Sequence, residues 1–432
     1  MNILVTGLCL QGNKGGPALA LSLKKQISNH VGPATFTFSV PPGQEFKYEV
    51  PWSVRYGVQV VEDFPLTDIL PPYCFRWFRA RMQRVSRWLA ALRSADVVVE
   101  MSAISYAGPP TGPYSWMFGG RFRYFVLSRL LCKRFYAWTQ SYGPFSTPLV
   151  RWLAKIDLRS QRVVFCRGDD CHACVRELLP DKTALSFPDV AVTLEFDQEF
   201  GREYVTSVFR SGQDGSLVTI SPSSVLHTKT RTPDAGSRHA EQLASFCEYL
   251  TGLGYRVLLV PHTYRPNRPD PCACDLAVSR LVLGKLENPN LVNVVTQDLS
   301  PIELKSIISC ADIHIGARYH SVVAALSSGV PCISLSWHPK YKDIMRMYGV
   351  EEYVYDGVAD SSASELRLLF DRLRRNVETI KPTLVRSQGL AAARVEENAK
   401  IFCQLMLAER KRSAGHPARR GLAATMMGAE PR

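Results

Sequence analysis

The sequence predicts an α/β protein made of two successive Rossmann-like domains with a cleft between them. Short, continuously apolar segments alternate with amphipathic segments along most of the chain, a pattern typical of parallel strands covered by helices on both faces. The length of 432 residues suits two or three domains rather than one. With 46% hydrophobic and 21% charged residues, the chain can bury a sizeable core, which excludes a mainly disordered protein.

The first domain is assigned to residues 1–205 and begins with a strand, a loop and a helix. The strand is expected at residues 3–5, and Pro17 suits the first turn of the helix, because its fixed φ and missing N–H carry no cost there. The turn between them contains Gly12, Asn13, Gly15 and Gly16. The pattern then recurs, with buried strands expected at residues 96–99, 134–140 and 163–166 and a helix at 122–132.

The second domain is assigned to residues 206–385 and repeats the pattern. A helix is expected to begin after Ser300, because Ser300 and Glu303 have the spacing of a capping box. Ligands in open α/β sheets bind beyond the carboxyl ends of the strands, so chemistry is expected in the loops after strands and in the cleft. Strands are expected at residues 217–221, 256–261, 291–295, 313–315 and 332–336, and further helices at 237–252 and 321–328.

A C-terminal helix is expected at residues 386–408, followed by a basic, disordered tail at residues 409–432. The formal charge of +13 is unevenly distributed, because six Arg lie between residues 69 and 95 without an acid and the tail carries a net charge of +4. These two stretches account for ten of the thirteen charges. The basic balance is therefore local and does not indicate a nucleic-acid-binding protein.

The Arg-rich stretch at residues 76–93 has the periodicity of an amphipathic helix. Apolar residues recur at intervals of four and three, whereas most of the arginines lie on other faces. One interpretation is a core-facing helix with a solvated basic face, and the other is a peripheral contact with an anionic membrane. The apolar positions are Phe78, Met82, Val85, Leu89 and Leu92, with Trp77 and Trp88 flanking them.

Neither a targeting segment nor a membrane span is expected. The N-terminus has no base before Lys14 and no apolar run long enough for a signal peptide, and no segment reaches the roughly 20 apolar residues of a membrane span. Twelve cysteines in such a chain indicate reduced thiols. We expect a cytoplasmic protein, with peripheral contact at the inner face of the membrane as an open alternative.

Clustered cysteines and a histidine raise the question of a metal site. The first group lies at an expected strand end and in the helix after it, and the downstream pair lacks the usual zinc-ligand spacing. Buried thiols are the favoured interpretation, and no metal is expected. The residues are Cys166, Cys171, His172, Cys174, Cys272 and Cys274.

The most informative stretch follows two successive strands of the second domain. Arg318 and His320 come directly after one expected strand, and Lys340 follows the next. Adjacent strand ends would bring a bidentate anion binder, a titratable imidazole and a point cation into one site. The alternative is that Arg318 pairs with a surface acid and that His320 caps the following helix.

Six motifs occur in a fixed order over residues 1–355. They are Gly-Asn-Lys-Gly-Gly at 12–16, Ser-Tyr-Gly-Pro at 141–144, Pro-Asp-x-Ala at 188–191, Leu-Val-Pro-His at 259–262, Gly-x-Arg-x-His at 316–320 and Pro-Lys at 339–340. An ordered set of six is much more specific than any one of them. Together they resemble the polysaccharide pyruvyl transferase family.

The resemblance implies a GT-B-like fold and the transfer of the pyruvyl group of phosphoenolpyruvate onto a sugar of a polysaccharide, glycolipid or lipid-linked glycan. The products would be a pyruvate ketal and phosphate, as in exopolysaccharide and cell-envelope synthesis. No cofactor is expected, because phosphoenolpyruvate is the co-substrate. Its carboxylate and phosphate need several fixed cations, and Arg167, Arg318 and Lys340 match anion-binding positions of the family.

His320 is the expected general acid/base, because an imidazole near neutrality can both give and take protons. Nearby cations would lower its pKa, and a bound dianion would raise it. Arg318 and Lys340 complete the expected catalytic set. The expected substrate-binding residues are Arg167, His262, Gly12, Asn13, Gly15, Gly16 and Tyr319. The glycines could instead serve a tight turn with positive φ, and His262 could be structural.

Two departures from the family pattern concern the acceptor. The family usually has an acid directly after the arginine that matches Arg167 and a serine four residues after it, where this chain has Gly168 and Cys171. The loop after Val99, often Gly-rich, reads Glu-Met-Ser-Ala-Ile-Ser-Tyr at 100–106. A GT-B glycosyltransferase that uses a nucleotide sugar is the main alternative function, although residues 206–400 contain no Glu-x7-Glu pair. A non-catalytic glycan- or phosphate-binding protein is the second.

Overall fold

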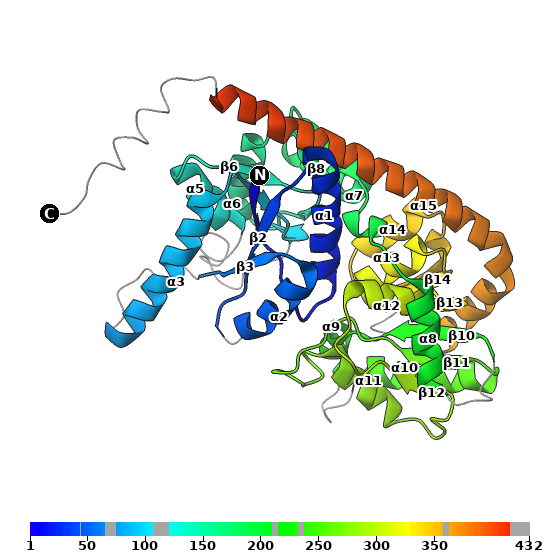
Figure 1. Ribbon diagram of the computed structural model, residues 1–432. Coiled ribbons are helices and arrows are strands. Elements are labelled where there is room, and N and C mark those ends of the chain that lie inside the picture. Colours follow the sequence, from blue (N-terminus) through cyan, green and yellow to red (C-terminus); the bar gives the residue numbers. More distant parts are fainter. Residues whose placement is uncertain are drawn as a thin grey trace.

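The computed structural model describes residues 1–43, 45–64, 75–106, 121–209, 215–231, 237–356 and 363–414. These residues form two α/β domains that lie side by side, with a long C-terminal helix running across both (Figure 1). Each domain is built on a parallel sheet, as the sequence predicts. None of the described helices combines the length and the apolar composition needed to cross a membrane.

The N-terminal domain has a central sheet with the strand order β3-β2-β1-β4-β6. Its strands are β1 (Asn2–Thr6), β2 (Thr35–Val40), β3 (Gln59–Glu62), β4 (Val97–Glu100) and β6 (Arg134–Ala137). Two further parallel pairs are β5 (Ile104–Ser105) with β7 (Ser141–Tyr142) and β8 (Val164–Arg167) with β9 (Ala184–Phe187). The helices are α1 (Gly15–Val31), α2 (Phe46–Tyr56), α3 (Phe75–Ser94), α5 (Arg121–Leu130), α6 (Pro148–Ser160) and α7 (Asp169–Leu178), followed by the 3-10 turn η2 (Val190–Thr193).

The C-terminal domain has a sheet with the strand order β12-β11-β10-β13-β14-β15. Its strands are β10 (Leu217–Ser221), β11 (Arg256–Leu259), β12 (Val292–Val294), β13 (Ile313–Gly316), β14 (Cys332–Leu335) and β15 (Val354–Tyr355). The helices include α9 (Ser224–Lys229), α10 (Arg238–Gly252), α11 (Asp275–Leu283), α12 (Pro301–Ile308), α13 (Tyr319–Ser327) and α14 (Lys340–Met347), with the 3-10 turn η3 (Glu351–Tyr353). The predicted capping box is present, with Ser300 as the N-cap of α12 and Glu303 as its partner.

Helix α8 (Gln198–Val208) precedes the second sheet in the chain but packs against α12 of the C-terminal domain. A Cβ atom at Gly201 would lie 2.2 Å from the carbonyl oxygen of Ser306, so the two helices approach closely. The predicted domain division at residue 205 therefore falls inside α8. The helix belongs with the second domain because its buried face is covered by that domain's core.

Helix α15 (Ala363–Ala414) is continuous across both domains (Figure 1). Phe370 packs against Phe246 of the C-terminal domain, and Phe402 packs against Trp138 of the N-terminal domain with ring centroids 4.7 Å apart. The predicted division at residue 385 therefore lies within this helix, because one apolar face covers both cores. Helix α15 also includes residues 409–414 of the predicted tail, and residues 415–432 lie outside the described residues.

Helix α3 corresponds to the predicted Arg-rich helix. Val85 and Leu92 are buried as predicted, whereas Met82 is 37% exposed. Trp88, which the sequence placed beside the apolar face, is buried, and its Nε1 donates a hydrogen bond to Ser39 Oγ at 2.8 Å. The side chains of Trp77 and Phe78 lie outside the described residues, and the membrane contact of this helix stays a prediction.

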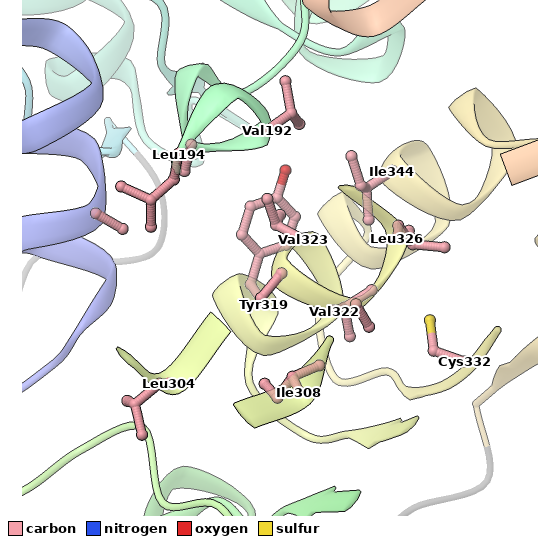
Figure 2. Close-up of a cluster of buried hydrophobic side chains, with 14 of the residues drawn as sticks. Val192, Leu194, Leu304, Ile308, Tyr319, Val322, Val323, Leu326, Cys332 and Ile344 are labelled. Atoms are coloured by element: carbon pink, nitrogen blue, oxygen red, sulfur yellow. The ribbon is translucent and has the colours of Figure 1, made fainter. Parts of the chain in front are cut away.

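Apolar side chains fill the contact between the domains (Figure 2). Tyr319, the first residue of α13, extends toward the η2 region that carries Val192 and Leu194. Helix α13 contacts both η2 and α1. This packing holds the start of α13 against the N-terminal domain.

Candidate functional site

Strand ends from the two domains meet at Tyr319. Arg167 ends β8 in the N-terminal domain, and its guanidinium carbon lies 4.9 Å from the centre of the Tyr319 ring. Lys340, which follows β14 in the C-terminal domain, has its Nζ 5.1 Å from the centre of the same ring. The structure therefore brings three of the predicted site residues together from both domains.

Arg167 is buried and held in one orientation by three hydrogen bonds. Its Nε donates to Ser141 Oγ at 3.1 Å, Nη1 to Asp189 Oδ2 at 2.7 Å, and Nη2 to the carbonyl oxygen of Ala103 at 2.9 Å. A guanidinium group has five N–H groups, so two remain for a ligand. The fork is thus fixed before any ligand binds.

Asp189, in the Pro-Asp-x-Ala motif, is the buried acid of this centre. Its Oδ1 accepts a hydrogen bond from the Ala191 N–H at 2.9 Å, while Oδ2 accepts the bond from Arg167. Burial by itself would raise the pKa of Asp189, but His320 and Arg167 outweigh burial and hold this pKa well below its usual range. Asp189 is therefore ionised at neutral pH.

His320 lies beside this pair, with Nε2 3.7 Å from Asp189 Oδ2. That separation is too long for a hydrogen bond, and the buried Nε2 has no other hydrogen-bond partner in the part of the chain that the structure describes. Burial lowers the pKa of His320, and Arg167 and Lys340 lower it further, whereas Asp189 acts in the opposite direction. His320 does not cap α13, because no side chain makes that bond. Among the described residues, Nε2 therefore makes no hydrogen bond that a proton transfer would have to break.

Lys340 begins α14 beneath three aromatic rings. Its Nζ lies 5.1, 5.2 and 5.8 Å from the ring centres of Tyr319, Trp337 and Tyr341. Burial, with a further contribution from Arg167, lowers its pKa to about 7. Within the described ranges, no hydrogen-bond acceptor or carboxylate lies within bonding distance of Nζ. The ammonium group is thus a desolvated cation without a bonded counter-ion.

Arg318 is turned toward a different acid. Its Nε and Nη2 donate to the two carboxylate oxygens of Asp275 at 2.8 and 2.5 Å, and Nη2 also donates to Ser224 Oγ at 2.8 Å. The alternative interpretation of the sequence was that Arg318 pairs with a surface acid. Arg318 does pair with an acid, but this acid is fully buried at the start of α11. The charge of Arg318 is therefore balanced within the C-terminal domain.

The glycine turn at residues 12–16 joins the two domains. The Lys14 N–H donates to the His262 carbonyl oxygen at 2.9 Å, and the Gly15 N–H donates to Asn13 Oδ1 at 3.1 Å. Only Gly12 has a positive φ, of 85°. A Cβ at Gly15 would lie 2.2 Å from His320 Nδ1, so the missing side chain leaves room for the imidazole. Gly16 likewise lies against the Cys9 carbonyl oxygen. The turn thus positions His320, and the Lys14 and Gly15 amides are bonded within the protein.

His262 is buried at the end of the β11 segment. Its Nδ1 lies 3.1 Å from Ser221 Oγ and 3.2 Å from the Val260 carbonyl oxygen. Since a carbonyl only accepts, Nδ1 carries the proton in the second bond. Burial lowers the pKa of His262 to about 4. The imidazole is neutral at pH 7 and helps to shape the small space beside His320.

A cavity of about 580 Å³ opens beside Lys340, between the two domains. The N-terminal domain lines it with the segment 141–144 and with Cys171 and Cys174, and the C-terminal domain lines it with His338, Lys340 and Asp343. The volume is within the usual range of small-molecule sites. Gly168 and Cys171, where the sequence departs from the family pattern, thus lie at this cavity or next to it.

Asp343 lies one helical turn after Lys340 and lines the same cavity. Burial and the neighbouring Asp170 raise its pKa to about 7, and Arg346 opposes them. A Cβ at Gly168 would lie 2.7 Å from Asp343 Oδ2, so only glycine leaves space for this carboxyl group. A carboxyl group that titrates near neutrality can exchange a proton at working pH.

Sequence reasoning missed the acids of the site. The motif at 188–191 included Asp189 without giving it a role, and no local pattern marks Asp275 or Asp343. The departure at Glu100 has a structural reason, because this side chain is buried and bonded to Arg121. Among the described residues, no group of three His, Cys, Asp or Glu side chains could hold a metal ion.

The family model for polysaccharide pyruvyl transferase matches residues 13–339 of the chain. Comparison with curated proteins finds no match. Among solved structures, the chain is similar to UDP-GlcNAc 2-epimerase from Neisseria meningitidis bound to UDP-GlcNAc, with a TM-score of 0.54, 10% identity and coverage of 95% of this chain and 100% of the other. It is also similar to a ugt transferase from Siraitia grosvenorii in complex with UDP, with a TM-score of 0.55, 10% identity and coverage of 94% and 99%. These similarities show the fold, which is two-domain, Rossmann-like and GT-B-like.

Proposed function

We propose that this chain, which belongs to the polysaccharide pyruvyl transferase family, transfers the pyruvyl group of phosphoenolpyruvate to a sugar of a polysaccharide, glycolipid or lipid-linked glycan. The observation that carries the proposal is the pair of cations on Tyr319. Arg167 and Lys340 come from different domains and lie within 5.1 Å of the same ring centre. A small dianion would bind between them at the mouth of the inter-domain cavity.

The charge balance of the site supports an anionic substrate. Asp275 balances Arg318 and Asp189 balances Arg167, but Lys340 adds a positive charge next to Arg167. Like charges repel strongly where water is excluded. An anion that contacts both cations removes this repulsion, and the two unused N–H groups of Arg167 suit a carboxylate or a phosphate.

The reaction requires two proton movements. A proton adds to C3 of the enol, two sugar oxygens bond to C2, and the bond between C2 and the phosphate oxygen breaks. The two hydroxyl protons balance the proton gained at C3 and the proton that leaves with phosphate. His320 Nε2 is the proposed general acid/base. The ionised carboxylate of Asp189 beside it stabilises the protonated imidazole. Asp343 is the proposed acceptor of a sugar hydroxyl proton, because its carboxyl group lines the cavity.

The direct test uses the full chain, phosphoenolpyruvate and candidate lipid-linked glycans. We expect phosphate release and a glycan whose mass has increased by one pyruvate ketal. Phosphoenolpyruvate should also raise the melting temperature of the protein, since a ligand that binds only the native state stabilises it. Stabilisation by a nucleoside diphosphate but not by phosphoenolpyruvate would instead favour a glycosyltransferase. Binding of phosphoenolpyruvate without phosphate release, with every glycan tried, would favour a non-catalytic binding protein.

A further inference from the structure

Helix α6 exposes a row of large apolar side chains. Leu149, Trp152 and Ile156 are 40%, 57% and 38% exposed. Their spacing of three and four residues places them on one face of the helix. The opposite face packs into the N-terminal domain through the buried residues Val150, Leu153, Ala154, Asp157 and Leu158.

Basic side chains border this row. On the helical wheel, Arg159 and Lys155 follow directly beside Trp152, and Arg159 is exposed while Lys155 is half-buried. The only acid of α6, Asp157, is buried and bonded to Arg121. The exposed surface of α6 is therefore apolar and basic, without a carboxylate of its own.

The position of α6 relates this surface to the cavity. Pro144 lines the cavity, and α6 begins four residues later at Pro148. Four residues span at most about 14 Å, so the start of α6 lies close to the cavity edge. Figure 1 shows α6 in the N-terminal domain beside α5, which it contacts.

We propose that the exposed face of α6, formed by Leu149, Trp152, Ile156, Lys155 and Arg159, binds the surface of an anionic lipid bilayer. Tryptophan favours the boundary between headgroups and acyl chains, and lysine and arginine are attracted to anionic headgroups. A protein partner would be expected to bring acidic side chains to the same face, whereas an anionic bilayer supplies both the apolar layer and the charge. Bilayer binding itself is independent of the reaction. Only its purpose, access of the cavity to a lipid-linked acceptor, rests on the proposed function.

The test is co-sedimentation of the full chain with vesicles of phosphatidylcholine alone or mixed with phosphatidylglycerol. We expect binding to the mixed vesicles that weakens as salt is added. The double variant Trp152→Ala, Ile156→Ala should weaken this binding at least tenfold, because it removes apolar contact area. The double variant Lys155→Gln, Arg159→Gln should weaken it about fivefold for each charge. All four side chains lie outside the proposed catalytic site.

Two controls make the assignment specific. Leu390→Ala removes an apolar side chain of α15 that is 65% exposed and should leave vesicle binding unchanged. The double variant Arg79→Gln, Arg87→Gln on α3 should have a smaller effect than either α6 variant. Failure of the wild type to bind mixed vesicles would overturn the proposal, as would full binding by the Trp152→Ala, Ile156→Ala variant.

Light scattering distinguishes self-association of the chain through this face of α6 from binding of the face to a bilayer. A wild-type dimer that dissociates in the Trp152→Ala, Ile156→Ala variant, with unchanged vesicle binding, would make this face a subunit interface and overturn the proposal. Phosphate release from phosphoenolpyruvate is measured in parallel. Vesicle binding without any use of phosphoenolpyruvate would overturn the proposed function and leave the bilayer surface standing.

Discussion

Two buried arginines of the N-terminal domain, Arg121 and Arg167, differ in how their charges are compensated. Arg121 bonds to two fully buried carboxylates, with Nη1 2.7 Å from Glu100 Oε2 and Nη2 3.1 Å from Asp157 Oδ1. Tyr106 and Gln140 donate further hydrogen bonds to these acids, each at 2.7 Å. Arg121 is thus enclosed by acids that are themselves satisfied.

Arg167 has one carboxylate partner and lies near a second cation. Asp189 is shared between Arg167 and His320, and Lys340 contributes positive charge from the other domain. Burial of an arginine is therefore not by itself an indicator of a ligand site. Uncompensated positive charge next to a cavity is the better indicator, because a bound anion can supply the missing negative charge.

The first prediction concerns His320, which lies beside Arg167 and shares its carboxylate partner Asp189. His320→Gln should lower the rate of phosphate release about 10²–10⁴-fold, the usual contribution of general acid–base catalysis. His314 is a matched control, because both of its ring nitrogens already bond, to Thr219 Oγ1 at 2.9 Å and to Ser321 Oγ at 3.0 Å. His314→Gln should lower the denaturation midpoint and leave the rate per folded molecule nearly unchanged. Equal rates for His320→Gln and wild type would remove His320 from the mechanism.

The second prediction concerns Arg121, whose charge is compensated by two buried carboxylates. Arg121→Met leaves Glu100 and Asp157 buried without a cation, and should lower the free energy of unfolding by about 3–5 kcal/mol. Arg374→Met is the control, because its pair with Asp371 is solvent-exposed and should contribute about 0–1 kcal/mol. Urea denaturation followed by circular dichroism measures both. A loss at Arg121 no larger than the loss at Arg374 would show that the buried cluster is not structural.

The smallest effect tests whether Lys340 is the uncompensated charge. In the free protein its pKa is about 7, so the ammonium form that attracts an anion is lost as the pH rises. Affinity for phosphoenolpyruvate should therefore fall by up to about tenfold per pH unit above pH 7, until the higher pKa of the bound complex is reached. Lys340→Arg keeps its charge throughout and should show a much flatter profile. Calorimetric titrations between pH 7 and 9 would measure both slopes, and equal slopes would exclude Lys340 as the titrating group.

Much of the fold could be predicted from the sequence, because the alternation of apolar strands and amphipathic helices is a local property. The predicted strand at residues 217–221 is β10, and the capping box at Ser300 begins α12. The same reasoning placed His320 directly after one buried strand and Lys340 after the next, where a parallel sheet brings side chains together, and the family resemblance added Arg167. Helices α8 and α15 were divided incorrectly, because the core that each one covers is assembled from distant segments.

The order of apolar and amphipathic segments was sufficient to predict a two-domain α/β protein whose candidate site cations follow strands. Which of those cations remain available for a ligand depends on contacts between segments that are distant in the sequence. Asp275 compensates Arg318 from 43 positions away, whereas Asp189 reaches Arg167 from 22 positions away and is shared with His320. The first two pairings depend on the tertiary fold within each domain, whereas the approach of His320 to Asp189 depends on how the two domains pack against each other. No local pattern of residues encodes either one. The unequal sharing of acids among cations therefore becomes visible only in the folded chain.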